Sequence, residues 1–316
     1  MGATLVTGGA GFIGSHLVER LLRDGRRVVV LDNFDPFYDA AIKRDNLRRA
    51  SSAPGFSLVE GDIRDPKAVA QALATAPVDT VIHLAARAGV RPSIKDPALY
   101  VSVNLDGTVT LLEACRREGV PTFVFGSSSS VYGDNDKVPF SEDDPVDHPV
   151  SPYAATKRAG ELLAHTYHHL FGMRVSCLRF FTVYGPRQRP DLAIHAFARR
   201  IRAGEALPVF GDGTSGRDYT YVDDIVEGIV RAAERTSGFH VWNLGGSHPV
   251  TLDEMIARLA RGLSKEAILD RQPPQPGDVR RTYADIARAQ RDLDWRPEVG
   301  FDEGIDRFLA WFSEKA

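Results

Sequence analysis

The chain has 316 residues, of which 43% are hydrophobic and 26% charged, and its formal net charge is −3. These values are typical of one large α/β domain, alone or with a smaller lobe. Acidic and basic residues are mixed along the chain without a basic stripe, and no apolar stretch reaches the ~20 residues of a membrane span. We therefore expect neither a nucleic-acid partner nor a membrane partner.

Cysteine and histidine positions give no sign of a metal site. Cys115 and Cys177 are far apart and show no Cys-x-x-Cys spacing, so reduced thiols are expected. His165, His168 and His169 share one face of an expected helix, but no carboxylate accompanies them at a matching spacing. The N-terminus begins without a charged leader and a long apolar core. A cytoplasmic protein without a bound metal is predicted.

Short apolar runs alternate with amphipathic stretches through the first 178 residues. The expected strands are Thr4–Thr7, Val28–Leu31, Ser57–Glu60, Thr80–Leu84, Thr122–Gly126 and Val175–Leu178. The expected helices between them include Phe12–Arg23, Pro66–Thr75, Tyr100–Arg117 and Pro152–Leu170. Strands that are apolar on both faces and alternate with helices indicate a Rossmann-type, doubly wound parallel sheet.

The rhythm breaks after Arg179. A segment rich in turn residues follows, then a basic helix around Ile194–Ala203, and the strand candidate His240–Leu244 is expected to return to the main sheet. This pattern predicts a Rossmann domain of residues 1–179, to which 218–245 return. Residues 180–217 and 246–316 would form a smaller α/β lobe that is discontinuous in sequence.

A glycine-rich segment, Thr7–Gly14, directly follows the first expected strand and opens a helix. Glycines permit a tight turn and a close approach of the backbone to a pyrophosphate, and the helix N-terminus supplies free N–H groups. Gly9, Gly11 and Gly14 fit one dinucleotide spacing, whereas Gly8, Gly11 and Gly14 fit a wider one. The sequence leaves open which glycine turns the chain.

An aspartate closes the second expected strand, eighteen residues after Gly14. The carboxylate of Asp32 can accept hydrogen bonds from a ribose and repels a 2′-phosphate, which favours NAD over NADP. Asp62 and Ile63 follow the third strand and are candidates for contacts to the adenine, although Asp62 alone could equally cap a helix.

Tyr153 and Lys157 stand four residues apart at the start of an expected helix, for which Ser151 is a plausible N-cap. They therefore share one helix face. An ammonium group near a phenol lowers the phenol pKa, so Tyr153 is expected to act as a general base on a sugar hydroxyl.

Together these motifs resemble the extended short-chain dehydrogenase/reductase family. The resemblance rests on Thr7–Gly14, Leu84–Ala86, Ser127–Gly133, Tyr153 with Lys157, Arg179–Pro186 and Arg217–Asp224, in this order along nearly the whole chain. It implies a Rossmann domain that holds NAD and a smaller lobe that holds a nucleoside diphosphate sugar. It also implies homodimers joined through the helix of Tyr153 and neighbouring residues of Tyr100–Arg117.

The resemblance also assigns residues to the cofactor. The cofactor-binding residues implied in this way are Gly8, Gly11, Phe12, Ile13, Gly14, Asp32, Asn33, Asp62, Ile63, Leu84, Ala85, Ala86, Tyr153 and Lys157.

The resemblance implies that Ser128 binds the reacting hydroxyl beside Tyr153. Sugar 4,6-dehydratases of this family carry an Asp-Glu pair at the positions of Ser129 and Ser130, and xylose-forming decarboxylases keep the Glu. A serine cannot do the acid–base work of a carboxylate. Dehydration and decarboxylation are therefore disfavoured, and epimerisation at carbon 4 through a transient 4-keto sugar is expected.

Two stretches, Ala88–Ser93 and Thr182–Ala193, are similar to the UDP-glucuronate 4-epimerases. In that group, small hydroxyl side chains matching Ser129, Ser130 and Thr182 hold the sugar carboxylate. Neutral hydrogen bonds can fix the carboxylate torsion of a 4-keto uronate without assisting the loss of CO₂. Serines would also tolerate the hydroxymethyl group of UDP-glucose or UDP-galactose, so a UDP-glucose 4-epimerase remains the main alternative.

The other substrate contacts follow from position in the family pattern. Arg217 is expected to clamp the diphosphate and Phe210 to contact uracil, while Arg189 and Asp278 reach the diphosphate and the uridine ribose. Arg91 is a further expected substrate contact. A non-catalytic NAD-binding regulatory protein is the alternative from a different class, and the intact Tyr153, Lys157 and Ser128 argue against it.

Overall fold

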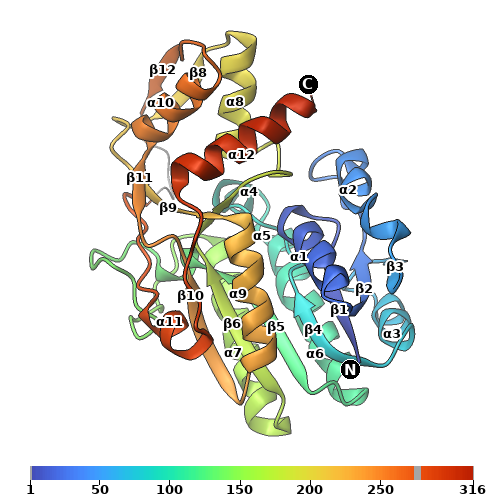
Figure 1. Ribbon diagram of the computed structural model, residues 1–316. Helices are drawn as coiled ribbons and strands as arrows, with labels where there is room; N and C mark the ends of the chain where they lie inside the picture. The colour runs from blue at the N-terminus through green and yellow to red at the C-terminus, as the bar shows by residue number, and fades with distance from the viewer. Residues whose placement is uncertain (1, 274–278, 316) are drawn as a thin grey trace.

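The computed structural model describes residues 2–273 and 279–315. Its centre is a seven-stranded, wholly parallel sheet of order β10-β6-β5-β4-β1-β2-β3 (Figure 1). The strands are β1 (Ala3–Thr7), β2 (Arg27–Asp32), β3 (Phe56–Glu60), β4 (Val78–His83), β5 (Thr122–Ser128), β6 (Arg174–Phe180) and β10 (Phe239–Leu244). The order reverses between β1 and β4, which is where doubly wound sheets bind their ligands.

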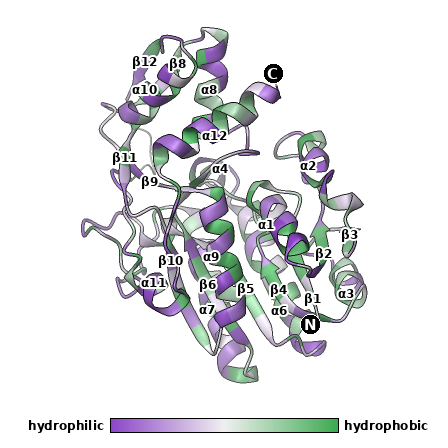
Figure 2. Cartoon of the chain, viewed as in Figure 1, coloured by the Kyte–Doolittle hydropathy of each residue, from purple (hydrophilic) through white to green (hydrophobic). Residues whose placement is uncertain are grey.

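Alternate residues of each strand face opposite layers, and two separate cores result. Val6, Val30 and Val124 belong to one core, while Leu5 and Val29 from the same strands belong to the other. The central strands are accordingly apolar on both faces (Figure 2).

Helices cover both faces of this sheet. The helices around this sheet are α1 (Phe12–Arg23), α2 (Ala40–Leu47), α3 (Pro66–Ala74), α4 (Val90–Lys95), α5 (Pro97–Val101), α6 (Gly107–Arg117), α7 (Pro152–Phe171), α9 (Val222–Arg235) and α11 (Ala287–Leu293). α1 and α9 pack in front of the sheet as drawn in Figure 1, while α3, α6 and α7 pack against the other core.

One expected helix contains a π-helical segment. The predicted helix over Tyr100–Arg117 is confirmed, and a π-helical segment, Ser102–Asp106, lies within it between α5 and α6. The wider turn places the Asn104 amide against the backbone of Arg87 and the hydroxyl of Thr156. A pattern of apolar residues does not register this change of helical pitch.

A smaller group of elements lies above the sheet in Figure 1. Its elements are β7 (Thr182–Tyr184), α8 (Ala193–Ala203), β8 (Leu207–Phe210), β9 (Gly216–Tyr221), β11 (Pro249–Thr251), α10 (Leu252–Gly262), β12 (Leu269–Gln272) and α12 (Phe301–Glu314). β9 pairs with β7 and β11, outside the main sheet, and β12 pairs with β8. The expected return of His240–Leu244 to the main sheet is confirmed, because β10 pairs with β6.

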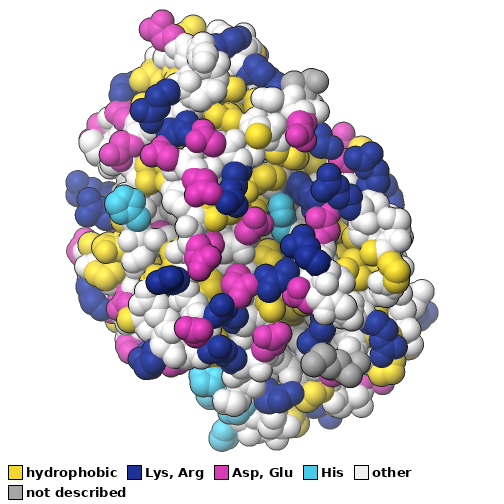
Figure 3. Space-filling model, in the orientation of Figure 1, with side chains coloured by type: hydrophobic (Ala, Val, Ile, Leu, Met, Phe, Trp, Pro, Cys, Tyr) yellow, Lys and Arg dark blue, Asp and Glu magenta, His cyan; other side chains and the backbone are white. Residues whose placement is uncertain are grey.

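The surface carries charges of both signs in alternation. Figure 3 shows Lys and Arg side chains interspersed with Asp and Glu over the face viewed. Within residues 2–273 and 279–315, no helix combines the length and the apolar character needed to cross a bilayer.

Candidate active site

A cavity of about 510 Å³ opens at the carboxyl ends of β1, β2, β4 and β5 and extends toward the smaller lobe. Most of the residues predicted to bind cofactor or substrate line this cavity. These lining residues are Gly8, Gly11, Phe12, Ile13, Gly14, Asp32, Asn33, Asp62, Ile63, Leu84, Ala85, Ala86, Ser128, Tyr153, Lys157, Thr182, Arg189 and Arg217.

The geometry of the turn between β1 and α1 shows which glycine reverses the direction of the chain. Gly8 has φ +71°, a conformation that strains other residues, and its carbonyl accepts a hydrogen bond from the Gly11 N–H at 3.1 Å. A Cβ added to Gly14 would lie 2.2 Å from the Gly8 oxygen. Gly8, Gly11 and Gly14 are therefore the three positions that the turn requires.

The first turn of α1 fits an anionic group. Gly11 is the N-cap, and no side chain caps the helix N-terminus, which faces the cavity. Free N–H groups and the positive end of the helix dipole favour a phosphate at this position. The glycine contacts leave room for such a group close to the backbone, so the local structure fits the pyrophosphate of a dinucleotide.

Asp32 ends β2 inside the cavity. Its carboxylate accepts hydrogen bonds from the Ala10 N–H at 3.0 Å and the Phe34 N–H at 2.9 Å, which fix its orientation. Burial raises the pKa of Asp32 above its ordinary value, and these two hydrogen bonds oppose the shift.

Asn33 and Asp62 form one hydrogen-bonded pair beyond Asp32. The Asn33 amide donates to Asp62 at 3.0 Å, and Asp62 also accepts from Arg64 at 2.7 Å. The Arg64 hydrogen bond lowers the pKa of Asp62. Both residues lie in the wall of the cavity, and their contact with the cofactor stays a prediction.

The proposed catalytic side chains converge from two elements. Tyr153 and Lys157 lie on the first turns of α7, where Ser151 caps the helix by accepting from the Ala154 N–H, and Ser128 ends β5. The Lys157 ammonium donates to the Gly126 carbonyl at 2.6 Å and lies 5.0 Å from the centre of the Phe125 ring.

The prediction that the pKa of Tyr153 is lowered is wrong, because this pKa is raised in the structure. Burial raises the pKa of Tyr153, and a hydrogen bond with Ser128 and the charge of Arg189 only partly offset this shift. Burial also lowers the pKa of Lys157 to about 8. Sequence reasoning counted the neighbouring ammonium and missed the desolvation of both groups.

The three consecutive serines 128–130, at the end of β5 and just after it, differ in their access to the cavity. The Ser128 hydroxyl donates to the Ser130 hydroxyl at 3.1 Å and accepts from the Ser130 N–H, so it caps the short 3₁₀ turn Ser129–Tyr132. Ser128 and Thr182 line the cavity, whereas Ser129 and Ser130 are not among the lining residues. The assignment of Ser129 and Ser130 to the sugar stays a prediction.

The predicted substrate contacts fall into two groups. Arg189 and Arg217 lie in the cavity wall. The Arg91 guanidinium instead stacks on the Phe210 ring, 4.7 Å from its centre, and neither residue is part of that wall. Asp278, the predicted ribose contact, lies outside the described residues.

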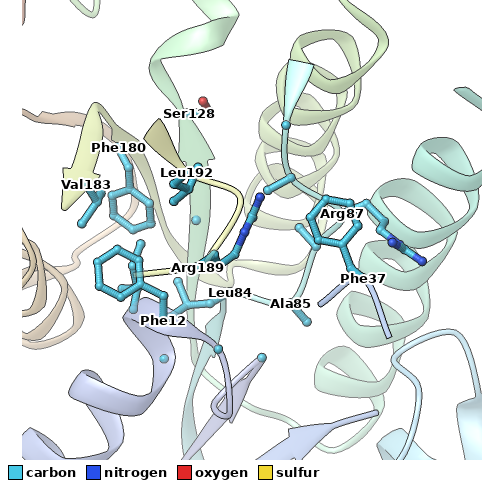
Figure 4. Close-up of a pocket in the computed structure, with 18 of the residues that line it drawn as sticks. Phe12, Phe37, Leu84, Ala85, Arg87, Ser128, Phe180, Val183, Arg189 and Leu192 are labelled. Atoms are coloured by element: carbon cyan, nitrogen blue, oxygen red, sulfur yellow. The ribbon is translucent and has the colours of Figure 1, made fainter. Parts of the chain in front are cut away.

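Sequence reasoning missed four residues of the cavity wall near the predicted Arg189: Asp35, Phe37, Lys43 and Arg87. Phe37 lies between Arg87 and Arg189, whose guanidinium carbons are 5.2 Å and 5.0 Å from its ring centre (Figure 4). Arg87 also pairs with Asp35 at 2.9 Å, and the Lys43 ammonium donates to the Asp35 carbonyl at 2.8 Å. The available signal was position, because Asp35, Phe37 and Arg87 closely follow the two predicted cofactor segments, 32–33 and 84–86.

The geometry therefore combines a dinucleotide turn with a tyrosine, a lysine and a serine in one cavity. This arrangement can hold a sugar hydroxyl next to a nicotinamide and remove its proton. Among the described residues, no group of three or more His, Cys, Asp or Glu side chains could hold a metal ion.

Comparisons with known proteins agree with this geometry. A UDP-glucuronate 4-epimerase from Thermodesulfobacterium geofontis is 42% identical over 99% of this chain and 97% of its own. UDP-glucuronate 4-epimerase 3 from Arabidopsis thaliana is 43% identical over 98% of this chain and 76% of its own.

Solved structures match over the whole length as well. The crystal structure of UDP-glucuronic acid 4-epimerase from Bacillus cereus, in complex with UDP-glucuronic acid and NAD, has a TM-score of 0.94 and 37% identity. It covers 99% of this chain and 100% of its own. A UDP-glucose 4-epimerase from Thermotoga maritima with UDP-glucose has a TM-score of 0.91 and 34% identity, with 99% of both chains covered.

The family model described as "NAD dependent epimerase/dehydratase family" matches residues 4–245, which include the glycine turn, Ser128, Tyr153 and Lys157. The chain belongs to the NAD-dependent epimerase/dehydratase family.

Proposed function

We propose that this enzyme interconverts UDP-glucuronate and UDP-galacturonate by NAD-dependent epimerisation at carbon 4. The observation that carries the proposal is a single cavity in which the glycine turn meets Tyr153, Lys157 and Ser128. The Ser129-Ser130 pair beside it contains no carboxylate that could drive elimination. The relatives named UDP-glucuronate 4-epimerase support the choice of sugar.

NAD supplies an acceptor that takes hydride from carbon 4 of the sugar and returns it. Tyr153 removes the proton of the 4-hydroxyl and later gives it back, while Ser128 orients that hydroxyl. Lys157 contributes positive charge near the phenolate, since the ammonium form is held by the Gly126 carbonyl. Because burial raises the pKa of Tyr153, the protein depends on nearby positive charge to make this residue a base.

The sugar must present both of its faces to the same hydride acceptor. Arg217 and Arg189 can hold the diphosphate by charge-assisted hydrogen bonds while the 4-keto sugar turns about its bonds to that group. Ser129, Ser130 and Thr182 are proposed to hold the carboxylate by neutral hydrogen bonds. This contact would keep the 4-keto uronate in a torsion that does not favour the loss of CO₂.

The deciding experiment follows the products by proton NMR. The purified protein is incubated with UDP-glucuronate and, separately, with UDP-glucose, without added reductant. UDP-galacturonate alone supports the proposal. UDP-galactose instead would leave C4 epimerisation in place and overturn the carboxylate site. A UDP-pentose would identify a decarboxylase, and no turnover of either sugar would contradict the proposed function.

We also propose that the enzyme is a homodimer joined through α5, α6 and α7. Val101 on α5 and Leu162, Leu170 and Phe171 on α7 are large apolar residues that are exposed in the single chain. Burial of such residues against a second copy would stabilise the pair. Sedimentation-velocity analysis of the wild type and of Leu162→Glu tests this surface.

The division into lobes and the cytoplasmic location remain proposals. The burial of α9 and β10 against the main sheet supports the assignment of most of 218–245 to the Rossmann domain, although β9 pairs elsewhere. Cys115 and Cys177 are free and buried, which suits a reducing compartment. Fractionation of cells that express a tagged chain tests the location.

A further inference from the structure

A buried ion pair lies directly behind the proposed catalytic residues. Glu161 on α7 is 1% exposed, and both of its carboxylate oxygens accept from Arg179 on β6, each at 2.9 Å. Arg179 is 2% exposed. Removing two charges from water is costly unless every polar atom finds a partner, so such a pair needs explanation beyond stability.

The pair is connected to both elements that carry catalytic side chains. Tyr153, Lys157 and Glu161 are spaced four residues apart and so share one face of α7. On the neighbouring strand β5, the Ser127 hydroxyl donates to Glu161 at 2.6 Å. The Gly126 carbonyl next to it accepts from Lys157 at 2.6 Å. Two consecutive residues of β5 are therefore held by two consecutive turns of α7, immediately before Ser128.

The network continues away from the cavity. Arg179 donates to the Tyr132 hydroxyl at 3.0 Å, which in turn donates to the Asn243 side chain at 2.6 Å. The Asn243 amide donates to the carbonyls of Phe140 and Asp285. The far end of the pair is thus tied to β10 and to two loops, which fixes Glu161 in one place.

The charge of Glu161 also acts on Lys157. Burial lowers the pKa of Lys157 to about 8, and the charge of Glu161 opposes this shift. Among the described residues, the titratable or charged groups around Lys157 include Tyr153 and Glu161 on α7, with Arg158 paired to Glu161, His83 on β4, and Arg179 behind Glu161 on β6. Burial lowers the pKa of His83 to about 3, so this histidine is neutral near pH 7 and leaves Glu161 as the anion that supports the ammonium form.

We infer that Glu161 and Arg179 form a positioning pair for the epimerase reaction: Glu161 holds Lys157 in its charged form and, through Ser127, fixes the end of β5 that carries Ser128. This inference rests on the proposed function for its kinetic consequences. Its electrostatic part concerns Lys157 alone and holds for any substrate.

The test uses the NAD-bound enzyme and Glu161→Gln, which keeps the side-chain shape and removes the charge. The Lys157 ammonium is followed by NMR with ¹⁵N-labelled lysine and assigned with Lys157→Met. We expect the pKa of Lys157 to fall by about one unit or more in Glu161→Gln. The basic limb of the kcat profile should move to lower pH by a similar amount, with KM within about twofold of the wild type.

Arg158→Gln is the matched control. Arg158 also pairs with Glu161, at 3.1 Å, but its side chain is 27% exposed and contributes neither to β5 nor to the cavity. The Arg158→Gln variant should leave the titration of Lys157 and the pH profile of kcat unchanged. Ser127→Ala should lower kcat without moving the titration, because only the link to β5 is cut.

Glu161→Gln strands the buried charge of Arg179 and can prevent folding. In that case Glu161→Met with Arg179→Met removes both charges and should lower the pKa of Lys157 by a smaller amount, because the repulsion from Arg179 is removed as well. A folded variant whose Lys157 titration and kcat profile coincide with those of the wild type would show that the pair is only structural. If the wild type turns over neither UDP-sugar, the proposed function fails, while the NMR titration still decides whether Glu161 controls Lys157.

Discussion

The two ends of the cavity are built in different ways. The cofactor end depends on backbone geometry within one short segment, where Gly8 turns the chain and Gly14 packs against its carbonyl. The proposed sugar end is lined by side chains such as those of Thr182, Arg189 and Arg217, which come from separate segments of the chain. A site that is formed by the backbone of one segment can be predicted from a few consecutive residues. A site that is formed by side chains from separate segments exists only in the folded chain.

The same difference extends to the charged groups that support each end. Near the cofactor end, His83 is neutral and bridges the hydroxyls of Thr7 and Thr108 at 2.7 Å and 3.0 Å. Near the sugar end, Asp218 on β9 is fully buried and accepts from backbone N–H groups such as that of Ala284. The two groups should respond to acid in opposite directions, which makes the comparison testable.

The largest expected effect is the loss of the base between the two ends. Tyr153→Phe removes the phenol oxygen that takes the 4-hydroxyl proton, so kcat should fall by about 10²- to 10⁴-fold. Epimerisation measured by NMR gives the rate, and the amount of retained NAD shows whether the cofactor end is intact. Tyr167→Phe is the control, because Tyr167 lies on the same helix and bonds to Glu113 outside the cavity. Equal loss in both variants would contradict the assignment.

The next effect tests the cofactor end through its backbone. In Gly14→Ala, the new Cβ would meet the Gly8 oxygen at 2.2 Å, and backbone atoms cannot yield as a side chain does. We expect a loss of about 3 kcal/mol in the free energy of unfolding and protein that purifies without NAD. Urea unfolding and absorbance of the extracted cofactor measure the two effects.

Gly300→Ala is the control for that change. Gly300 has φ −64°, and a Cβ there would meet nothing within 4 Å. This variant should retain its NAD and stay within about 0.5 kcal/mol of the wild type. Normal NAD content in Gly14→Ala would contradict the prediction that close backbone packing forms the NAD-binding end of the cavity.

His83 makes the cofactor end sensitive to acid. Its folded pKa is lowered to about 3, so below its ordinary value of 6.5 only the unfolded chain takes up the proton, and stability falls as the pH falls. Between about pH 7 and pH 4.5 this group should cost about 2.5 kcal/mol. Urea unfolding of His83→Gln should lack that component. If the free energy of unfolding fell equally with decreasing pH in the variant and the wild type, the role of His83 would be contradicted.

Asp218 should make the stability of the protein change with pH in the opposite direction. Burial raises its folded pKa to about 6, above the ordinary 3.8, so the folded chain binds the extra proton and stability falls as the pH rises. Between about pH 4.5 and pH 7 the loss should be about 2 kcal/mol. Asp218→Asn, unfolded in urea at both pH values, should gain that amount relative to the wild type. A constant difference between the two proteins would refute the assignment.

The fold was largely predictable, because its signal is local. Each of the seven strands of the main sheet was expected within a few residues, and α1 begins and ends where the pattern placed it. Apolar runs between amphipathic helices have few other solutions. The π-helical segment Ser102–Asp106 was missed, because the hydrogen bonds that Asn104 makes there reach residues far away in sequence, Arg87 and Thr156.

The site was predictable in its members more than in its electrostatics. Position in the family pattern brought Ser128, Tyr153 and Lys157 together, as their place in one cavity now supports. The contacts of Phe37 with Arg87 and Arg189 join three segments of the chain, so position after the predicted cofactor segments could point to Phe37 and Arg87 but not to these contacts. The direction of the Tyr153 pKa shift was wrong, because desolvation depends on everything packed around the hydroxyl.

The last strand of the main sheet has a consequence for how the chain is made. β6 ends at Phe180, but its neighbour β10 does not begin until Phe239. During translation at about 5–20 residues per second, the edge of β6 therefore stays open for several seconds while β7, α8, β8, β9 and α9 are synthesised. An open edge strand can pair with another nascent chain. Release of a ribosome-stalled chain just before β10 should therefore yield more aggregate than release just after Leu244.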